Sequence, residues 1–375
     1  MLTRDCIDCG LCARDCAFLQ RHGGARQLAE KASAGTLPPE VPWQCSLCGL
    51  CTRLCPKDLD PAAVMLELRR AHFRQGGRPL SAHRRILAYE RRGASPRFSL
   101  YLLPPGCRTV LFPGCALPGT RPGRLLELLH LLRQRYPDLG LVLDCCHKPS
   151  HDLGREEQVE RMFGPVVHFL LAQGVRRVLT ACPNCQRMFS SHGGALASQT
   201  VYEELCEINW QPPHTVAGTV TIHDPCGVRM RQGTHQAVRT LTTTLGLRIE
   251  EMRHCREKTV CCGEGGSVPY VAPGLAGSWT SLRLREAAER RVVTYCAGCV
   301  GFLGRHLHAM HLLDMVFAPR RALAGRIFVA RPPLTSLNRL WLKFLLRRRM
   351  RQARIGQRRH DGTIGLTNVP QGDAD

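Results

Sequence analysis

Eighteen of the 21 cysteines in this 375-residue chain recur in two internal repeats, and their order constrains the fold more than any other feature. In the short repeat, Cys6, Cys9, Cys12 and Cys16 recur 39 residues later as Cys45, Cys48, Cys51 and Cys55. In the long repeat, Cys115, Cys145, Cys146, Cys182 and Cys185 recur as Cys226, Cys261, Cys262, Cys296 and Cys299. The first residues lack the apolar run of a secretory signal, so we expect a cytoplasmic chain whose thiols bind metal instead of forming disulfides.

The short repeat has the spacing C-x2-C-x2-C-x3-C, which is the cluster-binding run of bacterial ferredoxins. Three thiolates at this spacing wrap one tight loop around three corners of a cubane, and the fourth cysteine ligates the other cluster. We therefore assign one [4Fe–4S] cubane to Cys6, Cys9, Cys12 and Cys55, and the other to Cys45, Cys48, Cys51 and Cys16. Zinc knuckles are the alternative, but zinc takes four ligands, usually as two pairs, and each triplet has an unmatched third cysteine.

Each long repeat alternates predicted strands with predicted helices. We expect strands near 108–112, 140–144 and 175–181 in the first copy, and near 219–223, 247–252 and 291–295 in the second. We expect helices near 124–133, 156–173, 234–246 and 278–290. This alternation predicts parallel βαβ units. Because the cysteines follow the strands, they should converge at the carboxyl edge of each sheet, where ligands bind in parallel sheets.

Three motifs of the second copy carry a resemblance to a known family: Cys261-Cys262-Gly263-Glu264-Gly265-Gly266, His223-Asp224-Pro225-Cys226 and Tyr295-Cys296-Ala297-Gly298-Cys299. They resemble the cysteine-rich CCG domain of heterodisulfide reductase, here in tandem. With the N-terminal ferredoxin run, the chain resembles the D-type subunit of that enzyme. It equally resembles the iron–sulfur subunits of anaerobic glycerol-3-phosphate dehydrogenase, glycolate oxidase and lactate utilisation complexes.

The resemblance implies a non-cubane [4Fe–4S] cluster at each complete set of five cysteines. The first copy reads Cys145-Cys146-His147, with histidine in place of the glycine of the motif. The sequence therefore leaves open whether one or two such clusters are bound, and whether His147 is itself a ligand.

From these patterns we predict an α+β multidomain chain. A helical two-cluster ferredoxin-type domain with its linker would span residues 1–95, and cysteine-rich CCG domains of α/β type would span 107–215 and 216–318. Residues 319–375 would form a basic amphipathic tail that contains a C-terminal helix.

The tail supplies a large part of the net charge of +22, because residues 319–360 hold 13 Lys or Arg and no Asp or Glu. Within it, helical spacing places apolar side chains on one face: Leu337, Leu340, Trp341, Phe344 and Leu345. A basic amphipathic helix favours an anionic membrane surface, so we expect residues 334–351 to bind peripherally at the inner face of the cell membrane. Docking on a partner subunit is the alternative. No window reaches 18 uninterrupted apolar residues, and we expect no transmembrane helix.

Together these patterns predict an iron–sulfur electron-transfer oxidoreductase subunit. Its two cubanes would pass electrons to the ten cysteines of the long repeats. The resemblance implies that these ten cysteines are catalytic and that their site reduces or oxidises a disulfide or thiol substrate. The alternative is a non-catalytic, membrane-proximal relay of a flavin dehydrogenase complex that passes electrons towards quinone. The chain has no glycine-rich nucleotide fingerprint, so we expect any flavin on a partner subunit. The ferredoxin triplets argue against nucleic-acid binding, which the charge would permit.

Several conspicuous residues have simpler interpretations. Cys107, Cys206 and Cys255 fall outside both repeats, and we expect them to be buried or incidental thiols. We expect Glu264 to belong to a tight turn after its strand, with shaping of a substrate cleft as the alternative. His223 and Asp224 are expected to hold the loop that precedes Cys226.

Overall fold

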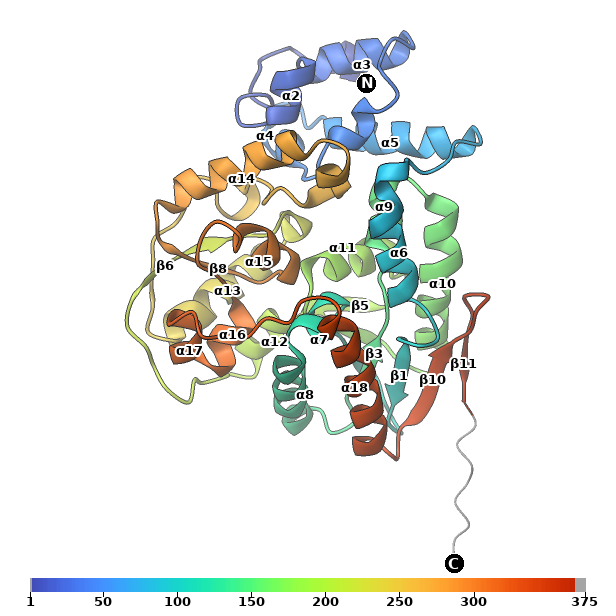
Figure 1. The fold of residues 1–375 in the computed structure, drawn as a ribbon, viewed down its shortest axis with the longest axis vertical. Coiled ribbons are helices and arrows are strands. Elements are labelled where there is room, and N and C mark those ends of the chain that lie inside the picture. The colour runs from blue at the N-terminus through green and yellow to red at the C-terminus, as the bar shows by residue number, and fades with distance from the viewer. Residues whose placement is uncertain (1, 368–375) are drawn as a thin grey trace, which may run out of the picture.

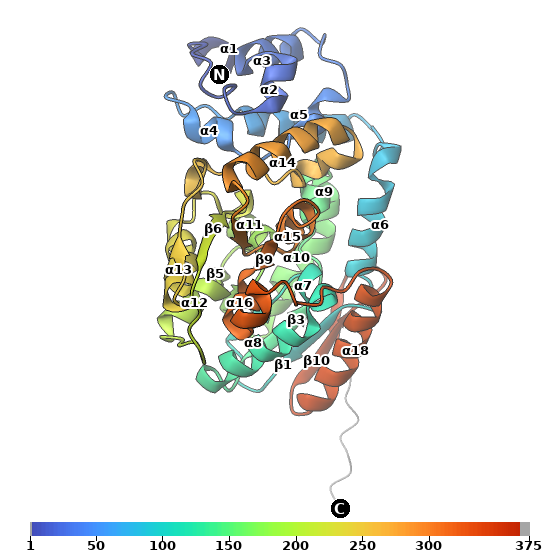
Figure 2. The same ribbon diagram turned by 60° about the vertical axis from the view of Figure 1, so that its left-hand side comes forward.

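The computed structural model describes residues 2–367. An N-terminal helical module lies at one end of the molecule, on two sheet-containing domains that lie side by side (Figures 1 and 2). The module and the segment that follows it contain α1 (Leu2–Asp5), α2 (Ala17–His22), α3 (Ala25–Ser33), η1 (Val41–Gln44), α4 (Leu50–Leu54), α5 (Pro61–Arg74), η2 (Ser81–His83) and α6 (Arg84–Gly93). The helix α5 begins at Pro61 because the Asp60 carboxylate accepts a hydrogen bond from the Ala63 N–H at 2.9 Å.

The first sheet-containing domain begins with β1 (Leu100–Leu103) and β2 (Thr109–Phe112), which are consecutive in the chain but separated by β3 in the sheet. It continues through α7 (Ala116–Thr120), α8 (Pro122–Arg135), β3 (Gly140–Leu143), α9 (Lys148–Leu153), α10 (Glu156–Ala172), β4 (Arg177–Thr180), α11 (Pro183–His192), β5 (Ala197–Thr200) and α12 (Val201–Glu207). The second domain contains β6 (Thr219–His223), η3 (Cys226–Val228), α13 (Gln232–Thr244), β7 (Arg248–Ile249), η4 (Arg256–Lys258), η5 (Gly265–Tyr270), α14 (Pro273–Ala287), β8 (Arg291–Thr294), α15 (Ala297–Leu303), β9 (Ala309–His311), α16 (Leu312–Phe317) and α17 (Pro319–Leu323).

The two domains repeat one topology. Their parallel strands run in the orders β3-β2-β4-β5 and β7-β6-β8-β9, which are the same order within each copy. The predicted parallel βαβ units are confirmed, with all six predicted strands and the four predicted helices present. The domains share one hydrophobic core, which includes Leu111 and Leu179 from the first sheet and Ile222 and Val293 from the second.

The C-terminal segment does not form a separate tail. After α18 (Leu334–Arg349), the chain forms β10 (Arg354–Arg358) and β11 (Ile364–Leu366), and β10 pairs antiparallel with β1, which pairs antiparallel with β3. Within the predicted tail, β10 and β11 therefore extend the first sheet. Residues 368–375 lie outside the described residues. The sequence of β10, Arg-Ile-Gly-Gln-Arg, has no strand-like apolar alternation that would have predicted this pairing.

The helix α18 is present as predicted, and the apolar face predicted for a membrane surface stays largely exposed, while a second apolar side that the sequence analysis did not identify is buried. Leu342 and Leu346 are the side chains that enter the shared core, whereas Leu337, Trp341 and Phe344 are 57%, 49% and 59% exposed. The helix carries apolar residues on two sides, and packing against α7 and α8 decides which side is covered. Across residues 2–367, none of the helices combines the length and the apolar character needed to span a bilayer.

Arg69 joins the N-terminal module to both sheet-containing domains. Its side chain is fully buried and donates hydrogen bonds to backbone carbonyls of Pro42 and Cys45 in the module, of Asp152 in the first domain and of Gly266 in the second. Burial lowers the pKa of this guanidinium to about 10. Five donors in one plane suit such a junction, because they satisfy several carbonyls at once.

Replacing Arg69 with alanine is expected to lower the free energy of unfolding by about 3 kcal/mol or more, because buried carbonyls of three segments lose their donor. Chemical denaturation under anaerobic conditions measures the effect. Arg70→Ala is the matched control, since the neighbouring Arg70 makes only partly exposed ion pairs, with Glu67 at 3.7 Å and with Glu156 at 3.4 Å. That control should cost less than about 1 kcal/mol. Equal losses in the two variants would show that Arg69 does not act as the junction.

Candidate metal centres

The eight cysteines of the N-terminal module form two groups of four around two small cavities. One cavity is lined by Cys6, Cys9, Cys12 and Cys55, and the other by Cys16, Cys45, Cys48 and Cys51. Each group takes three thiols from one triplet and the fourth from the other run, which is the cross-pairing expected for two cubanes. Four thiols around a mainly apolar cavity are a donor set that fits an iron–sulfur cluster.

Burial disfavours the thiolate form of three cysteines of the second group, Cys16, Cys45 and Cys51. Burial raises the pKa of Cys45 to about 11, and it also raises the pKa values of Cys16 and Cys51. A coordinating metal deprotonates a thiol outright, so binding recovers the cost of burying these groups. The Leu47 N–H donates to Cys45 Sγ at 3.4 Å, a bond that stabilises a ligating sulfur.

The ten cysteines of the long repeats line one cavity of about 390 Å³ between the two sheet-containing domains. They lie after the carboxyl ends of β2, β3, β4, β6 and β8 and in the loop before η5, so the sheets present their ligand-binding edges to each other. Cys182 of the first domain and Cys296 of the second both line this cavity, and the thiol of Cys296 helps to lower the pKa of Cys182 across the boundary. The two sets of five thiols are therefore one continuous site.

The adjacent cysteine pairs have the same local geometry in both domains. The His147 N–H donates to Cys145 Sγ at 3.4 Å, and the Gly263 N–H donates to Cys261 Sγ at 3.3 Å. A hydrogen bond from Cys145 lowers the pKa of Cys115 to about 7. Each set of buried thiols is therefore arranged to share protons or a metal, which fits a metal cluster as ligand.

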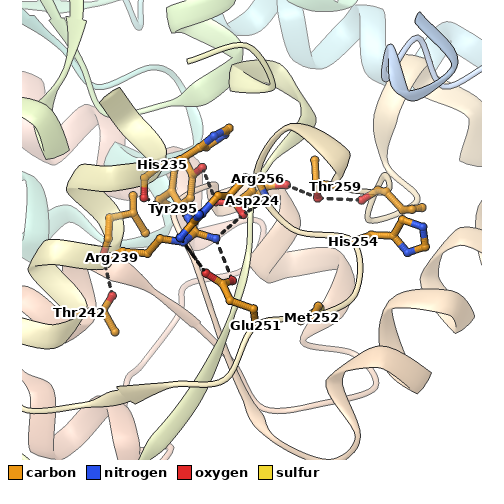
Figure 3. Close-up of polar contacts among 12 residues, drawn as sticks. Asp224, His235, Arg239, Thr242, Glu251, Met252, His254, Arg256, Thr259 and Tyr295 are labelled. Carbon is orange, nitrogen blue, oxygen red and sulfur yellow. Dashed lines mark hydrogen bonds and ion pairs between the residues drawn. The ribbon is translucent and has the colours of Figure 1, made fainter. Parts of the chain in front are cut away.

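Asp224 holds together the loops that carry the second set of cysteines (Figure 3). Its carboxylate is fully buried and accepts from Arg239 Nη1 and Nη2 at 3.0 and 2.8 Å, from Tyr295 OH at 2.9 Å and from the Arg256 N–H at 2.6 Å. Tyr295 precedes Cys296, and Arg256 lies in the loop that leads to Cys261. One side chain thus fixes the segments around three ligand positions, in line with the structural role expected for it.

Asp144 has the corresponding role in the first domain, and sequence reasoning missed it. It accepts from the Cys145 N–H at 2.7 Å, from Tyr101 OH and from Arg358 Nη2 at 2.8 Å. Arg358 comes from β10, so the C-terminal segment supports the first cysteine site directly. The position of Asp144 immediately before Cys145 was the available signal, but nothing local in the sequence indicates its distant partner.

Glu90 is a second residue that sequence reasoning missed. It lies on α6, and its carboxylate, Cys145 Sγ and a ring nitrogen of His147 all lie within 4.8 Å of one another. Burial opposes ionisation of Glu90, but the nearby His147 ring and the hydrogen bonds from Ser150 outweigh it and lower the pKa of this carboxyl. In the second domain, a ring nitrogen of His223 and the sulfurs of Cys262 and Cys299 likewise lie within 4.8 Å of one another.

Glu264 lines the ten-cysteine cavity, whereas Cys107, Cys206 and Cys255 line neither this cavity nor those of the module.

The second ferredoxin-type loop touches the loop of the second cysteine pair. A Cβ on Gly265 would lie 2.8 Å from the Ser46 carbonyl and 2.9 Å from Cys261 Sγ, so only glycine permits this approach. Ser46 lines both the cavity of Cys16, Cys45, Cys48 and Cys51 and the ten-cysteine cavity. The group of Cys16, Cys45, Cys48 and Cys51, called the inner group below, and the ten-cysteine site are therefore neighbours through Ser46.

Comparison with known protein families identifies the domains. Residues 3–59 match the 4Fe-4S dicluster domain, and residues 109–190 and 220–304 each match the cysteine-rich domain named CCG. The chain therefore contains a ferredoxin-type module followed by two cysteine-rich domains, a combination that indicates iron–sulfur clusters.

Comparison with curated proteins gives several relatives. The chain is 28% identical to the B-type subunit of fumarate reductase (CoM/CoB) from Methanothermobacter marburgensis, over 79% of this chain and 66% of the relative. It is 22% identical to the D-type subunit of dihydromethanophenazine:CoB–CoM heterodisulfide reductase from Methanosarcina barkeri, over 68% of this chain and 69% of the relative. It is 23% identical to "EtfAB:quinone oxidoreductase" of Syntrophomonas wolfei, over 60% of this chain and 36% of the relative. The chain thus spans about two thirds of the first two relatives and a smaller part of the third. The resemblance to heterodisulfide reductase is confirmed.

Proposed function

We propose that this iron–sulfur electron-transfer subunit carries electrons from an outer cluster at Cys6, Cys9, Cys12 and Cys55, through an inner cluster at Cys16, Cys45, Cys48 and Cys51, to the ten-cysteine cavity. In that cavity a disulfide substrate is reduced or a pair of thiols is oxidised. The observation that carries the proposal is that all ten cysteines of the long repeats line one cavity. The contact at Ser46 supports the order of transfer, because it joins the inner group to this cavity.

Disulfide reduction requires the cavity to deliver electrons and protons to the substrate. Reduction of one disulfide consumes two electrons and two protons and releases two thiols. Clusters bound by the cysteines supply electrons one at a time. The chain's own residues shape and polarise the space: Lys148, Asp152 and Glu264 line the cavity together with Tyr89 and Tyr270. The cavity of about 390 Å³ would be shared between the clusters held by its cysteines and a substrate of small-molecule size.

The test is iron, sulfide and low-temperature EPR on anaerobically purified protein. Two cubanes alone correspond to about 8 iron atoms, and loading of one or both cysteine-rich sites raises this to about 12 or 16. An additional paramagnetic signal on thiol addition, lost in Cys261→Ala while the cubane signals remain, is the expected result. Iron near 8 with no response to thiol would refute the catalytic proposal and leave an electron relay.

A second candidate function is a relay at a membrane surface, and the exposed face of α18 favours it. Leu337, Trp341 and Phe344 are exposed beside the arginine-rich last turn of the helix. Leu337 also borders a groove of about 560 Å³ between α18 and α6, with Arg91 and Arg92 on its other side. Figure 2 shows these two helices along the same flank of the molecule. Exposed apolar side chains among arginines suit an anionic lipid surface. In this function the electrons leave towards quinone through a partner subunit, which also holds any flavin.

Replacing Trp341 and Phe344 together with serine is expected to weaken binding to anionic phosphatidylglycerol vesicles at least tenfold, because the apolar contribution is lost. Vesicle sedimentation measures it. Removing residues 334–351 would instead expose the shared core that Leu342 and Leu346 fill. The matched control is Phe328→Ser, at a 74% exposed aromatic residue outside α18. Unchanged binding of the double variant would exclude this face as the membrane contact.

A further inference from the structure

The two cysteine-rich sites differ in which buried imidazole lies next to their thiols. In the first site it is His147, which is 1% exposed and follows the Cys145-Cys146 pair. In the second site it is His223, which is fully buried at the end of β6. Among the described residues, neither ring nitrogen of either histidine has a hydrogen-bond partner. A buried imidazole without partners is costly, so a ligand that uses these nitrogens would explain their retention.

The backbone at His147 gives no local reason for a histidine. Its φ is +56°, in the left-handed region, and the equivalent residue of the second domain is Gly263, whose φ is +110°. Glycine adopts such a conformation without strain, whereas other residues pay about 1 kcal/mol or more. The first domain therefore has a histidine at a position where the backbone conformation favours glycine. The side chain itself must have a role.

Glu90 faces His147 from the neighbouring helix. Glu90 Oε1 lies 3.5 Å from His147 Nδ1. The carboxylate is 3% exposed and is held in place by Ser150, whose N–H donates at 2.9 Å and whose hydroxyl donates at 2.5 Å. A carboxylate beside one ring nitrogen keeps the proton there and leaves the lone pair of the other nitrogen for a metal.

The donor set at this corner of the cavity is that of a metal site. The carboxylate oxygen of Glu90, Cys145 Sγ and a ring nitrogen of His147 lie within 4.8 Å of one another. Cys145 belongs to the first five-cysteine set, so a cluster held by that set would lie within reach of the imidazole. The pairing of carboxylate, histidine and metal is a common arrangement in metalloproteins.

We propose that His147 is a nitrogen ligand of the cluster in the first cysteine-rich site, bound through Nε2, and that Glu90 is the residue that positions it. The inference rests on the proposed function, namely that the first five-cysteine set holds a cluster. An imidazole ligand is neutral and a thiolate is negative, so nitrogen ligation raises the reduction potential of an iron–sulfur centre. The group around His223 contains no carboxylate, so a positioned nitrogen ligand is assigned to the first site alone, which makes the first site the stronger electron acceptor.

The experiment is pulsed EPR on anaerobic, reduced full-length protein, prepared with natural-abundance or ¹⁵N-labelled histidine. The first-site signal is assigned by its loss in Cys145→Ala. The expected result is a nitrogen coupling of directly bonded strength on that signal, which changes with the label. His147→Gly should abolish the coupling and shift the signal to a lower potential. It keeps the backbone N–H that bonds Cys145 Sγ, as Gly263 does for Cys261.

Matched variants separate ligation from structure. His223→Phe introduces the residue that the first domain has at the end of β2, Phe112, and should leave the first-site coupling unchanged. Glu90→Gln keeps an acceptor for the Nδ1–H and should retain the coupling, whereas Glu90→Ala should weaken it. A first-site signal without nitrogen coupling, or with coupling that survives His147→Gly, would overturn the inference alone. Iron near 8 with cubane signals only would overturn the proposed function and the inference together.

Discussion

Replacing Cys48 with alanine is expected to remove one cubane and to stop electron transfer into the ten-cysteine site. Cys48 belongs to the inner group, whose loop touches the Cys261 loop at Ser46 and Gly265. Iron content should fall by about four atoms per chain, and reduction of the cysteine-rich site by an electron donor protein should slow by at least about 100-fold. Rapid-freeze EPR measures the rate, and iron analysis measures the loss.

Two further variants make this prediction specific. Cys9→Ala removes a ligand of the outer group, so it should lose the same amount of iron but leave the inner cluster open to reduction by a small reductant such as dithionite. Cys255→Ala changes a cysteine that lines none of the four-cysteine or ten-cysteine cavities, and it should lose no iron. Full iron content in Cys48→Ala would refute the assignment of the inner cubane.

Replacing Asp224 with alanine is expected to have the largest effect on stability. The change leaves the buried Arg239 guanidinium and the Tyr295 hydroxyl without their shared acceptor (Figure 3). Breaking a buried ion pair from one side costs about 3–5 kcal/mol, which is a large fraction of the total stability of a typical domain. The midpoint of thermal unfolding should fall by about 10 °C, and the second cysteine site should lose its metal before the cubanes do.

The control for Asp224 is the other carboxylate that binds Arg239. Glu251 accepts from Arg239 Nε at 2.6 Å, but its side chain is 32% exposed, so water replaces it when it is removed. Glu251→Ala should therefore cost no more than about 1 kcal/mol. Differential scanning calorimetry of both variants provides the comparison. A loss from Glu251→Ala as large as that from Asp224→Ala would show that burial of the pair is not the cause.

Local sequence patterns were sufficient to predict six of the strands and the candidate ligands. The grouping of the eight module cysteines, the parallel βαβ units of both domains and the position of the cysteines after their strands all rest on patterns a few residues long. Ligand spacing is local because a tight loop must wrap a compact cluster, and strand periodicity is local because it reflects the geometry of one segment. The resemblance to heterodisulfide reductase added the chemistry expected at the second repeat, and the comparisons confirm that resemblance.

Other features depend on segments that meet only in the folded protein. The sequence shows two apolar sides on α18, and only packing against α7 and α8 decides that Leu342 is buried and Trp341 is exposed. Asp144 meets Arg358 from a strand 214 residues away, and Glu90 meets His147 from a separate helix. Residue spacing cannot predict such contacts, because they arise from the relative placement of whole elements. By itself, the sequence determined the candidate ligands and the repeat, since both are set within single loops and strands. The tertiary structure alone decided which buried charges support each site and which surface stays uncovered, since those depend on long-range packing.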